Sequence, residues 1–551
     1  MEILAVSRSE PRWHDVNGQK MFTSIVHDPL TSQSDYIELD ESGVVDNATA
    51  ARITLRYKGK PVLEQDIHLG DIWNIGEGVR LQVCGSRIPC EKVSWRCRQK
   101  TQWLQSLAAS GRVGVYLRVL TGGRVHPGDE VVCEHASEDN VDVATVTQVA
   151  YDTSLKTRDT LDVLSNHKLL LEMNRFLLRR KLTSMDDKLN QGKNAWKGWR
   201  GLRVDRVVEE GGDVKSFYLQ AHDGQPLANY LPGQFLSVRL PDGKIRSWTI
   251  SDWPARTDPP YYRISIKLAG EESSWMHREC TPGTVLQVRS PAGRFVLDWT
   301  QKYSPRQIYV SAGIGITPVL AMMKAHDRHP NYQQVPALWI HVAKNSAALP
   351  FRDEVPRFEG RLFRRMLFFT DPLPSDVLGI DYDFAGRPEP EALLEILAES
   401  YTWKPLASRD CRMEGHMSFA YVCGPPAFEA AMRACLLPGG GVGLPPPFVH
   451  SESFSRSGAA AAGAGDVQRA TVRFARSGKQ AVWARDDNPN LTLLELAEAA
   501  GLTPDYGCRV GACGSCAARL VCGSVSGGMQ LDGTVLTCSA TPASEVVKID
   551  I

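Results

Sequence analysis

No stretch of this 551-residue sequence approaches the about 18–20 consecutive apolar residues that a membrane-spanning helix requires. Neither sign of charge is in excess, because 63 Lys and Arg balance 63 Asp and Glu, and no basic cluster indicates a nucleic-acid partner. The first residues lack a charged segment followed by an apolar one, so we expect no secretory signal. These absences predict a cytoplasmic protein without a membrane span, and the length predicts several domains.

Cysteine, in contrast, is plentiful, with thirteen residues. In a reducing compartment cysteines more often form metal sites or stay as buried thiols than pair as disulfides. Four of them fall within 31 residues near the C-terminus: Cys508, Cys513, Cys516 and Cys538. The first three share one glycine-rich loop with Cys-x4-Cys-x2-Cys spacing, whereas zinc sites usually show two short Cys-x2-Cys hooks. Soft thiolates suit iron–sulfur chemistry, so these residues predict a [2Fe–2S] cluster.

The segment before this loop supports the same interpretation. Strands are expected at 470–474 and 480–484, and Thr492 with Glu495 forms a capping box that opens a short helix. A sheet, a helix and then a cysteine loop resemble the β-grasp fold of plant-type ferredoxins. The spacer before Cys538 is shorter than is usual in that family and contains Cys522. Cys522 is therefore the alternative fourth ligand.

The chain divides into four modules in this interpretation. They are 1–190, which ends in a helical tail, then 198–300, 301–454 and 468–551. The segment 455–467 consists largely of Ser, Ala and Gly without periodicity, which is typical of a flexible linker. In the second module, runs at 202–208 and 214–219 predict a β-hairpin.

Two motifs in the second module have the residues of a flavin site. The first is Arg246-Ser247-Trp248-Thr249, in which an Arg fork can bind a phosphate, an aromatic ring can cover the isoalloxazine and a hydroxyl can reach flavin N5. The second motif places a helix N-terminus and hydroxyls around an anion, with the residues Gly270, Ser273 and Ser274. Both motifs resemble the ferredoxin–NADP⁺ reductase superfamily, in its phthalate dioxygenase reductase and flavohaemoglobin branches. That resemblance implies an antiparallel flavin-binding β-barrel, and FMN and FAD stay open.

The third module continues the resemblance with a nicotinamide site. A strand, a glycine loop and a helix start are expected where a dinucleotide pyrophosphate binds, at Gly313, Gly315, Thr317 and Pro318. The family places Cys-Gly-Pro beside the nicotinamide, which corresponds to Cys423, Gly424 and Pro425, and closes with an acid and an aromatic residue, Glu452 and Phe454. The resemblance thus implies an α/β nucleotide-binding domain and catalytic roles for Thr249, Cys423 and Glu452. NADH and NADPH stay open, because Lys344 could bind a 2′-phosphate or simply be an exposed lysine.

The first module resembles MOSC domains, the β-barrels of molybdenum-cofactor sulfurase C-termini and of bacterial N-hydroxylaminopurine reductases. The resembling segments are 67–76, 85–90, 111–119 and 128–129. In that family the Cys of Arg-x-Pro-Cys is the candidate molybdenum ligand, which here is Cys90. A segment of some forty residues that the family carries is missing here.

Together the modules predict a multidomain α/β and β oxidoreductase that passes electrons from NAD(P)H through a flavin to the [2Fe–2S] cluster. The first hypothesis ends at a molybdenum cofactor and reduces N-hydroxylated or N-oxide small molecules. The alternative is a reductase component for a separate oxygenase, with the MOSC-like region as a docking or cofactor-binding module.

Overall fold

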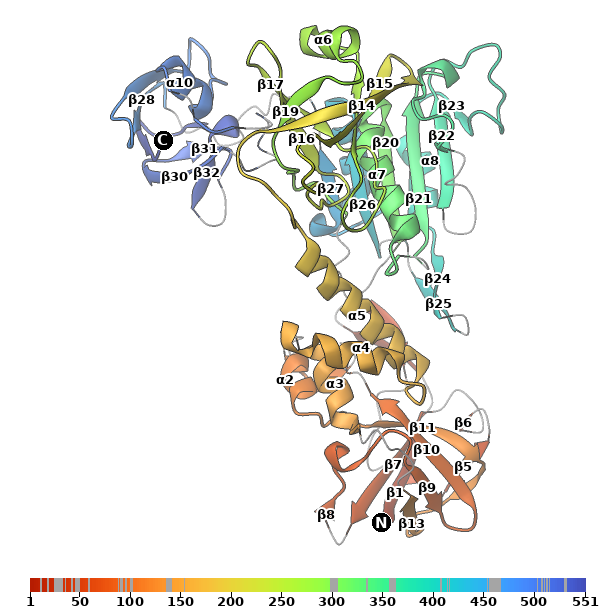
Figure 1. Cartoon of the computed structure of the whole chain (residues 1–551). Coiled ribbons are helices and arrows are strands. Elements are labelled where there is room, and N and C mark those ends of the chain that lie inside the picture. The colour runs from red at the N-terminus through yellow and green to blue at the C-terminus, as the bar shows by residue number, and fades with distance from the viewer. Residues whose placement is uncertain are drawn as a thin grey trace. The chain divides into compact units, whose positions relative to one another are not determined.

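The computed structural model forms two compact units, Met1–Asp187 and Lys188–Ile551 (Figure 1). It describes the whole chain except residues 10–11, 17–18, 24–32, 35, 41–42, 45–49, 58–59, 88, 90–92, 95–96, 100–102, 135–140, 153, 298–305, 333–334, 356–362, 407–408, 414, 416, 453, 455–466, 503, 507–508, 510, 512–513, 515 and 530–532. The predicted linker at 455–467 therefore lies almost wholly outside the described residues.

Three small sheets and a hairpin build the β part of the first unit. The first sheet has the order β4 (Gln33–Ser34), β1 (Glu2–Ser9), β7 (Ala50–Tyr57), β8 (Lys60–Pro61). The second has the order β11 (Val115–Thr121), β10 (Val79–Ser86), β9 (Ile72–Ile75), β13 (Val131–Glu134). The third comprises β12 (Gly123–Val125), β5 (Ile37–Asp40) and β6 (Gly43–Val44), and β2 (Arg12–Val16) pairs with β3 (Gln19–Thr23).

Alternating apolar residues explain how this unit forms a core. Val79, Leu81 and Val83 alternate along β10 and are buried on one face of the second sheet. They share one cluster with Leu161 and Leu178, which come from helices. The helices of this part of the chain are α2 (Trp103–Ala109), α3 (Val143–Tyr151), α4 (Arg158–Asn166) and α5 (Glu172–Asn190), the last of which continues into the second unit. Helices α4 and α5 lie in the segment where the sequence predicts a helical tail, whereas the described strands form separate sheets and not one closed barrel.

The second unit begins with a six-stranded antiparallel sheet. Its order is β17 (Ile245–Thr249), β16 (Phe235–Arg239), β19 (Val285–Val288), β14 (Arg200–Gly211), β15 (Val214–Ala221), β18 (Tyr262–Lys267). The hairpin predicted from Glu-Glu-Gly-Gly-Asp is confirmed as β14–β15. The edge strands β17 and β18 are joined by one isolated antiparallel bridge among the described residues, between Ile250 and Ile264. The predicted barrel is therefore closed by this one β-bridge.

A parallel six-stranded sheet follows. Its order is β23 (Phe384–Ala385), β22 (Phe363–Phe369), β21 (Ala337–Ala343), β20 (Arg306–Ala312), β26 (Ser418–Cys423), β27 (Val449–Glu452). All residues of β20, β21 and β26 are buried, as expected for strands covered on both faces. The helices α7 (Ile316–Arg328), α8 (Pro390–Ala398) and α9 (Pro426–Leu436) accompany this sheet, and β24 (Tyr401–Leu406) and β25 (Arg409–Met413) form a separate hairpin. This is the α/β nucleotide-binding fold that the sequence predicts.

The C-terminal segment of the second unit has its own sheet and core. The sheet order is β29 (Gln480–Ala484), β28 (Arg469–Phe474), β34 (Val546–Ile549), β30 (Ala517–Cys522), β32 (Thr534–Leu536), and β31 (Val525–Ser526) pairs with β33 (Thr541–Pro542). The predicted capping box is confirmed, because the hydroxyl of Thr492 accepts from the backbone of Glu495 at the start of α10 (Leu493–Ala499). One sheet with one short helix across it matches the expected β-grasp arrangement.

Candidate functional site

The three residues predicted to be catalytic each end a strand. Thr249 is the last residue of β17, Cys423 the last of β26 and Glu452 the last of β27. Cys423 and Glu452 are direct partners across β26 and β27. Strand ends present side chains at the edge of a sheet, which is where open α/β sheets bind their ligands.

The flavin motif lies on β17, beside the helix α6 (Glu271–Glu279). Trp248 is partly buried and packs against the core of this region, and Thr249 is 5% exposed. Ser247 faces Ser237 of β16, with the two hydroxyl oxygens 3.2 Å apart. The aromatic face and the hydroxyl required beside a flavin are therefore held by sheet packing.

The two predicted phosphate-binding segments meet through an ion pair. Arg246 donates to Glu272 of α6 at 2.5 Å, and Lys244 lies 3.5 Å from the same carboxylate. A hydrogen bond from its own backbone N–H, together with these two cations, holds the pKa of Glu272 below its usual range. A flavin phosphate at Arg246 would therefore displace Glu272 from the guanidinium, a competition that the sequence motif did not reveal.

The hydroxyls of this segment cap α6. Ser273 accepts from the backbone N–H groups of Ala269 and Gly270, each at 2.9 Å, and Ser274 donates to the carbonyl of Gly270 at 2.7 Å. Gly270 is the N-cap residue of the helix. Since both hydroxyls hold the helix start, they would orient a ligand anion mainly by fixing the backbone N–H groups.

The glycine loop after β20 packs directly on the end of β26. A Cβ atom at Gly315 would lie 2.3 Å from the carbonyl oxygen of Cys423, and a Cβ at Gly424 would lie 2.7 Å from Phe428. At Gly313, with φ of +52°, a Cβ would meet no atom within 4 Å, so the loop leaves room for a ligand to approach there. The two nicotinamide motifs therefore meet as the sequence interpretation requires.

The helix start differs in register from the expectation. The sequence placed Thr317 at the N-cap and Pro318 at the first helical position. In the structure a 3-10 turn, Gly313–Gly315, leads directly into α7 with Gly315 as N-cap, so Thr317 lies inside the first turn. Its hydroxyl donates to the carbonyl of Ile314 at 2.9 Å. Pro318 still lies within the first turn, where its missing N–H costs nothing.

The chemistry of Cys423 follows from its surroundings. Its side chain is fully buried, and burial, followed by the charges of Glu452 and Glu429, raises the pKa of the thiol well above its ordinary value. Cys423 is therefore a protonated thiol at neutral pH. Pro425, two residues after Cys423, is exposed and precedes α9, and Phe454 is 44% exposed.

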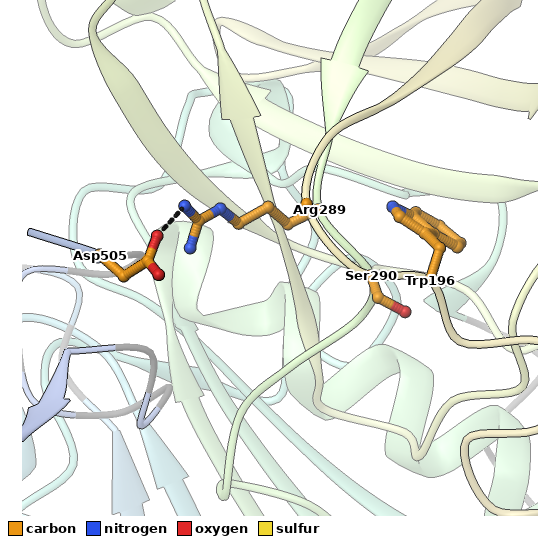
Figure 2. Close-up of a pocket in the computed structure, with 5 residues that line it drawn as sticks. Trp196, Arg289, Ser290 and Asp505 are labelled. Atoms are coloured by element: carbon orange, nitrogen blue, oxygen red, sulfur yellow. Dashed lines mark hydrogen bonds and ion pairs between the residues drawn. The ribbon is translucent and has the colours of Figure 1, made fainter.

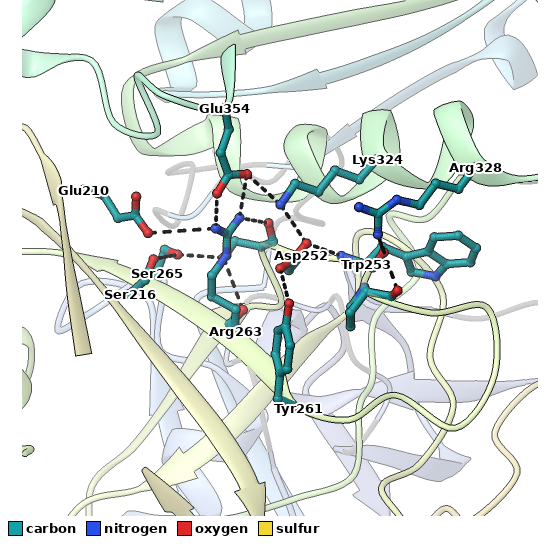
Figure 3. A network of polar contacts seen from close by, with 12 residues as sticks. Glu210, Ser216, Asp252, Trp253, Tyr261, Arg263, Ser265, Lys324, Arg328 and Glu354 are labelled. Carbon is teal, nitrogen blue, oxygen red and sulfur yellow. Dashed lines mark hydrogen bonds and ion pairs between the residues drawn. The ribbon is translucent and has the colours of Figure 1, made fainter. Parts of the chain in front are cut away.

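A buried ionic network joins the antiparallel and parallel sheets, and sequence reasoning missed it (Figure 3). The guanidinium of Arg263 on β18 has no exposed area and lies 2.5 Å from Glu354 and 3.8 Å from Glu210. Lys324 of α7 lies 2.6 Å from Glu354 and 2.7 Å from Asp252. Two cations and three carboxylates therefore connect the antiparallel sheet, which carries the flavin motif, with helix α7, which follows the glycine loop.

The network sets the charge state of its carboxylates. Burial would raise the pKa of Asp252 and of Glu354, but the charges of Arg263 and Lys324 outweigh it and lower both values. The pKa of Glu210 is raised, because burial outweighs Arg263 there. This network is hard to predict from the sequence, because Arg263 alternates with apolar residues, a pattern typical of an outward-facing position, and its main partner lies 91 residues away.

Two of the four predicted cluster ligands lie within the described residues, and the structure brings them together. The sulfur atoms of Cys516 and Cys538 are 3.3 Å apart, both side chains are buried, and the backbone N–H of Gly511 points at the sulfur of Cys538 at 3.2 Å. Cys522 instead is exposed at the end of β30. Cys508 and Cys513 lie outside the described residues. Sulfur atoms that converge under backbone N–H donors fit the donor set of an iron–sulfur cluster.

The predicted molybdenum ligand, Cys90, also lies outside the described residues. Next to it in the sequence, the carbonyl of Pro89 accepts from the hydroxyl of Tyr151. Across the residues described in both units, no group of three or more His, Cys, Asp or Glu could hold a metal ion.

Two domain families match this chain. Residues 32–132 match the MOSC domain. Residues 482–543 match the 2Fe-2S iron-sulfur cluster binding domain. Both resemblances stated from the sequence motifs are thereby confirmed, and the second match includes all four predicted cluster cysteines.

The flavin and nicotinamide region is similar to flavohemoproteins. The chain is 35% identical to the flavohemoprotein of Deinococcus radiodurans over 250 residues, which cover 44% of this chain and 56% of the relative. It is 29% identical to the flavohemoprotein of Bacillus subtilis over 276 residues, which cover 49% of this chain and 63% of the relative. The chain thus spans little more than half the length of the curated relatives it matches.

Solved structures give weaker likenesses. A phthalate dioxygenase reductase, described as a modular structure for electron transfer from pyridine nucleotides to [2Fe-2S], is 22% identical, with a TM-score of 0.41, covering 64% of this chain and 98% of that one. The flavohem-like FAD/NAD binding domain of a Vibrio cholerae nitric oxide dioxygenase is 21% identical, with a TM-score of 0.36, covering 47% and 99%.

Within the described ranges, no helix combines the length and the apolar character needed to span a membrane.

Proposed function

We propose that this protein is an NAD(P)H-dependent oxidoreductase that passes electrons through a bound flavin to a [2Fe–2S] cluster held by Cys508, Cys513, Cys516 and Cys538. The observation that supports it most directly is the convergence of the Cys516 and Cys538 sulfur atoms, 3.3 Å apart, in a segment that matches the cluster-binding domain. The exposed position of Cys522 favours Cys538 as the fourth ligand. The four-module division of the chain belongs to the same proposal.

A flavin is required because hydride transfer moves two electrons and an iron–sulfur cluster carries one, and a flavin exchanges both. Trp248 would cover the ring, Thr249 would hydrogen-bond it, and Arg246 would hold the phosphate after releasing Glu272.

The nicotinamide side of the site belongs to the parallel sheet. The loop at Gly313 would take the dinucleotide phosphates at the start of α7, where the helix dipole favours an anion. Cys423 holds its proton at the end of β26, beside Glu452. With a nicotinamide bound, the Cys423 thiol would pack against the ring, and the buried surface around the thiol would exclude water.

The destination of the electrons has two candidates. The match of residues 32–132 to the MOSC domain favours an internal acceptor, a molybdenum cofactor at Cys90 that reduces N-hydroxylated or N-oxide compounds. The second candidate is transfer to a separate redox protein, with the MOSC region serving for docking or for cofactor binding.

One purified sample tests the proposal. Flavin, iron, sulfide and molybdenum are quantified per chain, and NADH- and NADPH-driven reduction of ferricyanide and cytochrome c is measured. Flavin and about two iron atoms per chain, with both acceptors reduced, are expected. Molybdenum near one per chain that is lost in Cys90→Ala supports the internal acceptor. Absence of molybdenum with cytochrome c reduction intact supports the separate acceptor. A sample that binds flavin and iron but reduces neither acceptor would refute the proposed function.

A further inference from the structure

We propose that Arg289 is the docking contact through which the flavin-binding region receives the cluster loop, by pairing with Asp505. This inference rests on the proposed electron transfer and names the surface that enables it. Arg289 directly follows β19, and its guanidinium lies 3.0 Å from the carboxylate of Asp505 (Figure 2). In the sequence Asp505 precedes the predicted ligand Cys508 by three residues.

The guanidinium of Arg289 is held in place by an aromatic platform. It lies 4.8 Å from the ring centre of Trp199, and Arg239 approaches the same indole at 4.1 Å. The backbone N–H of Arg289 donates to the carbonyl of Ser237 at 2.9 Å. Two arginines on one indole concentrate positive charge at one point of the surface, and such a point attracts a carboxylate.

A small cavity surrounds this contact. It is lined by Trp196, Gly198, Arg289, Ser290 and Asp505 (Figure 2). The indole N–H of Trp196 donates to the carbonyl of Val288 at 3.1 Å, which holds the wall of the cavity to β19. The wall beside Arg289 is thus tied to β19, whereas the Asp505 side chain that contacts Arg289 is 83% exposed.

A second contact places the cluster loop itself at the same surface. Gly514, which lies between Cys513 and Cys516 in the sequence, has φ of +76°, and a Cβ there would lie 3.9 Å from a guanidinium nitrogen of Arg294. Arg294 follows Arg289 by five residues, so both contacts are made by one short segment after β19. The flavin-binding side therefore offers arginines, and the cluster side offers a carboxylate and a glycine without a side chain.

The chemistry of the pair suits a contact that forms and breaks. An exposed carboxylate paired with an arginine is weak and is screened by salt, so it guides approach and orientation without locking the two surfaces together. Because each NADH supplies two electrons and the cluster carries one at a time, the loop must engage twice for each NADH oxidised. A reversible charge pair permits that repetition.

Charge reversal tests the inference in the full-length protein loaded with flavin and iron. Arg289→Glu, Asp505→Arg and the double variant are compared in two assays. In the proposed electron path, ferricyanide would take electrons from the flavin and cytochrome c would take them through the cluster, and each NADH would reduce two molecules of either acceptor. We expect each single reversal to lower the cytochrome c rate about 5- to 20-fold, with the ferricyanide rate within about twofold of the original. The double variant restores the ion pair with the charges exchanged, so its cytochrome c rate should lie within about threefold of the original protein's rate.

Matched controls carry the same charge changes elsewhere. Arg203→Glu changes an exposed arginine on β14 of the same sheet, and Asp487→Arg changes an exposed aspartate of the C-terminal domain. Neither should alter the cytochrome c rate by more than about twofold. Iron and flavin per chain are measured for every variant. If a charge-reversal variant has a lower iron content, the neutral variants Arg289→Gln and Asp505→Asn are measured in its place. In these neutral variants the cytochrome c rate should depend less on salt concentration.

The outcomes separate the two proposals. If the original protein oxidises NADH with neither acceptor, the proposed function fails. If it reduces both acceptors, but charge reversal or neutralisation leaves the cytochrome c rate and its salt dependence unchanged, the docking inference is refuted and the electron-transfer proposal stands. Loss of activity in the single variants without recovery in the double variant also refutes the pairing.

Discussion

Replacing Arg263 with methionine should destabilise the second unit strongly, and the network in Figure 3 allows the size to be worked out. The guanidinium is fully buried and is the cation nearest to Glu354 and Glu210. Methionine fills a similar length without charge, so Arg263→Met leaves three largely buried carboxylates, including Asp252, with Lys324 as the remaining cation. Breaking a buried ion pair by removing one partner costs about 3–5 kcal/mol.

Differential scanning calorimetry at pH 7 measures this cost. For a domain of roughly 150–250 residues, each kcal/mol shifts Tm by about 2–4 °C, so the variant should lose roughly 6–20 °C in the transition of this region. Hydrogen exchange identifies the region, because peptides from β18 and α7 should lose protection first. Arg203→Met, at an exposed position of the same sheet, is the control and should shift Tm by less than about 2 °C.

The stability of the second unit should also depend on pH through this network. Glu354 and Asp252 have pKa values below their ordinary 4.5 and 3.8, so their contribution to stability is complete above those ordinary values and is lost as the pH falls through the lowered ones. Since Arg263 is one cause of the lowering, the difference in Tm between the original protein and Arg263→Met should shrink below about pH 4. A Tm within 2 °C of the original at pH 7, or a difference that grows in acid, would refute this account of the network.

Three further changes test individual contacts. Gly315→Ala adds a Cβ that would lie 2.3 Å from the Cys423 oxygen, so the loop must shift, and kcat/KM for NADH should fall about tenfold or more; an unchanged value contradicts the close packing. Cys538→Ser should remove most of the iron and lower the cytochrome c rate at least about tenfold while ferricyanide reduction persists, and retained iron would point to Cys522 instead. Asp371→Ala frees Lys344, whose ammonium lies 3.5 Å from that carboxylate, so the NADPH-to-NADH ratio of kcat/KM should rise about 3- to 10-fold, and a constant ratio would exclude Lys344 from 2′-phosphate binding.

Local signals made much of the fold predictable. The hairpin β14–β15 and the capping box at Thr492 depend on residues close together in sequence, and both are confirmed. The start of α7 was predicted two residues late. Thr317 was expected to be the N-cap, but Gly315, at the end of a 3-10 turn, has that position. Propensity alone does not distinguish these two starts, since each puts Pro318 in the first turn.

The parts of the site that the sequence did not reveal depend on distant residues. The Arg246–Glu272 pair sets a carboxylate where a phosphate was expected, and the motif pattern has no means of showing that competition. Arg263 alternates with apolar residues in β18, which favours an exposed side chain, yet its guanidinium is buried against Glu354, 91 residues away. Such pairings are fixed by how the two sheets meet and not by local propensity.

The order of strands in the parallel sheet also means that β20 is synthesised well before one of its two neighbouring strands. The strand β20 is central, and its partner β26 is translated much later: the side chains of Arg306 and Ser418, which bond across these strands, are 112 residues apart. At about 5–20 residues per second, a ribosome needs roughly 6–22 s to cover that distance. During this interval one edge of a strand that is wholly buried in the folded protein has no partner, although β21 is already present on the other side. We therefore expect slower translation of the segment between β20 and β26 to lower the yield of folded protein, because the unpaired edge then has longer to meet another chain.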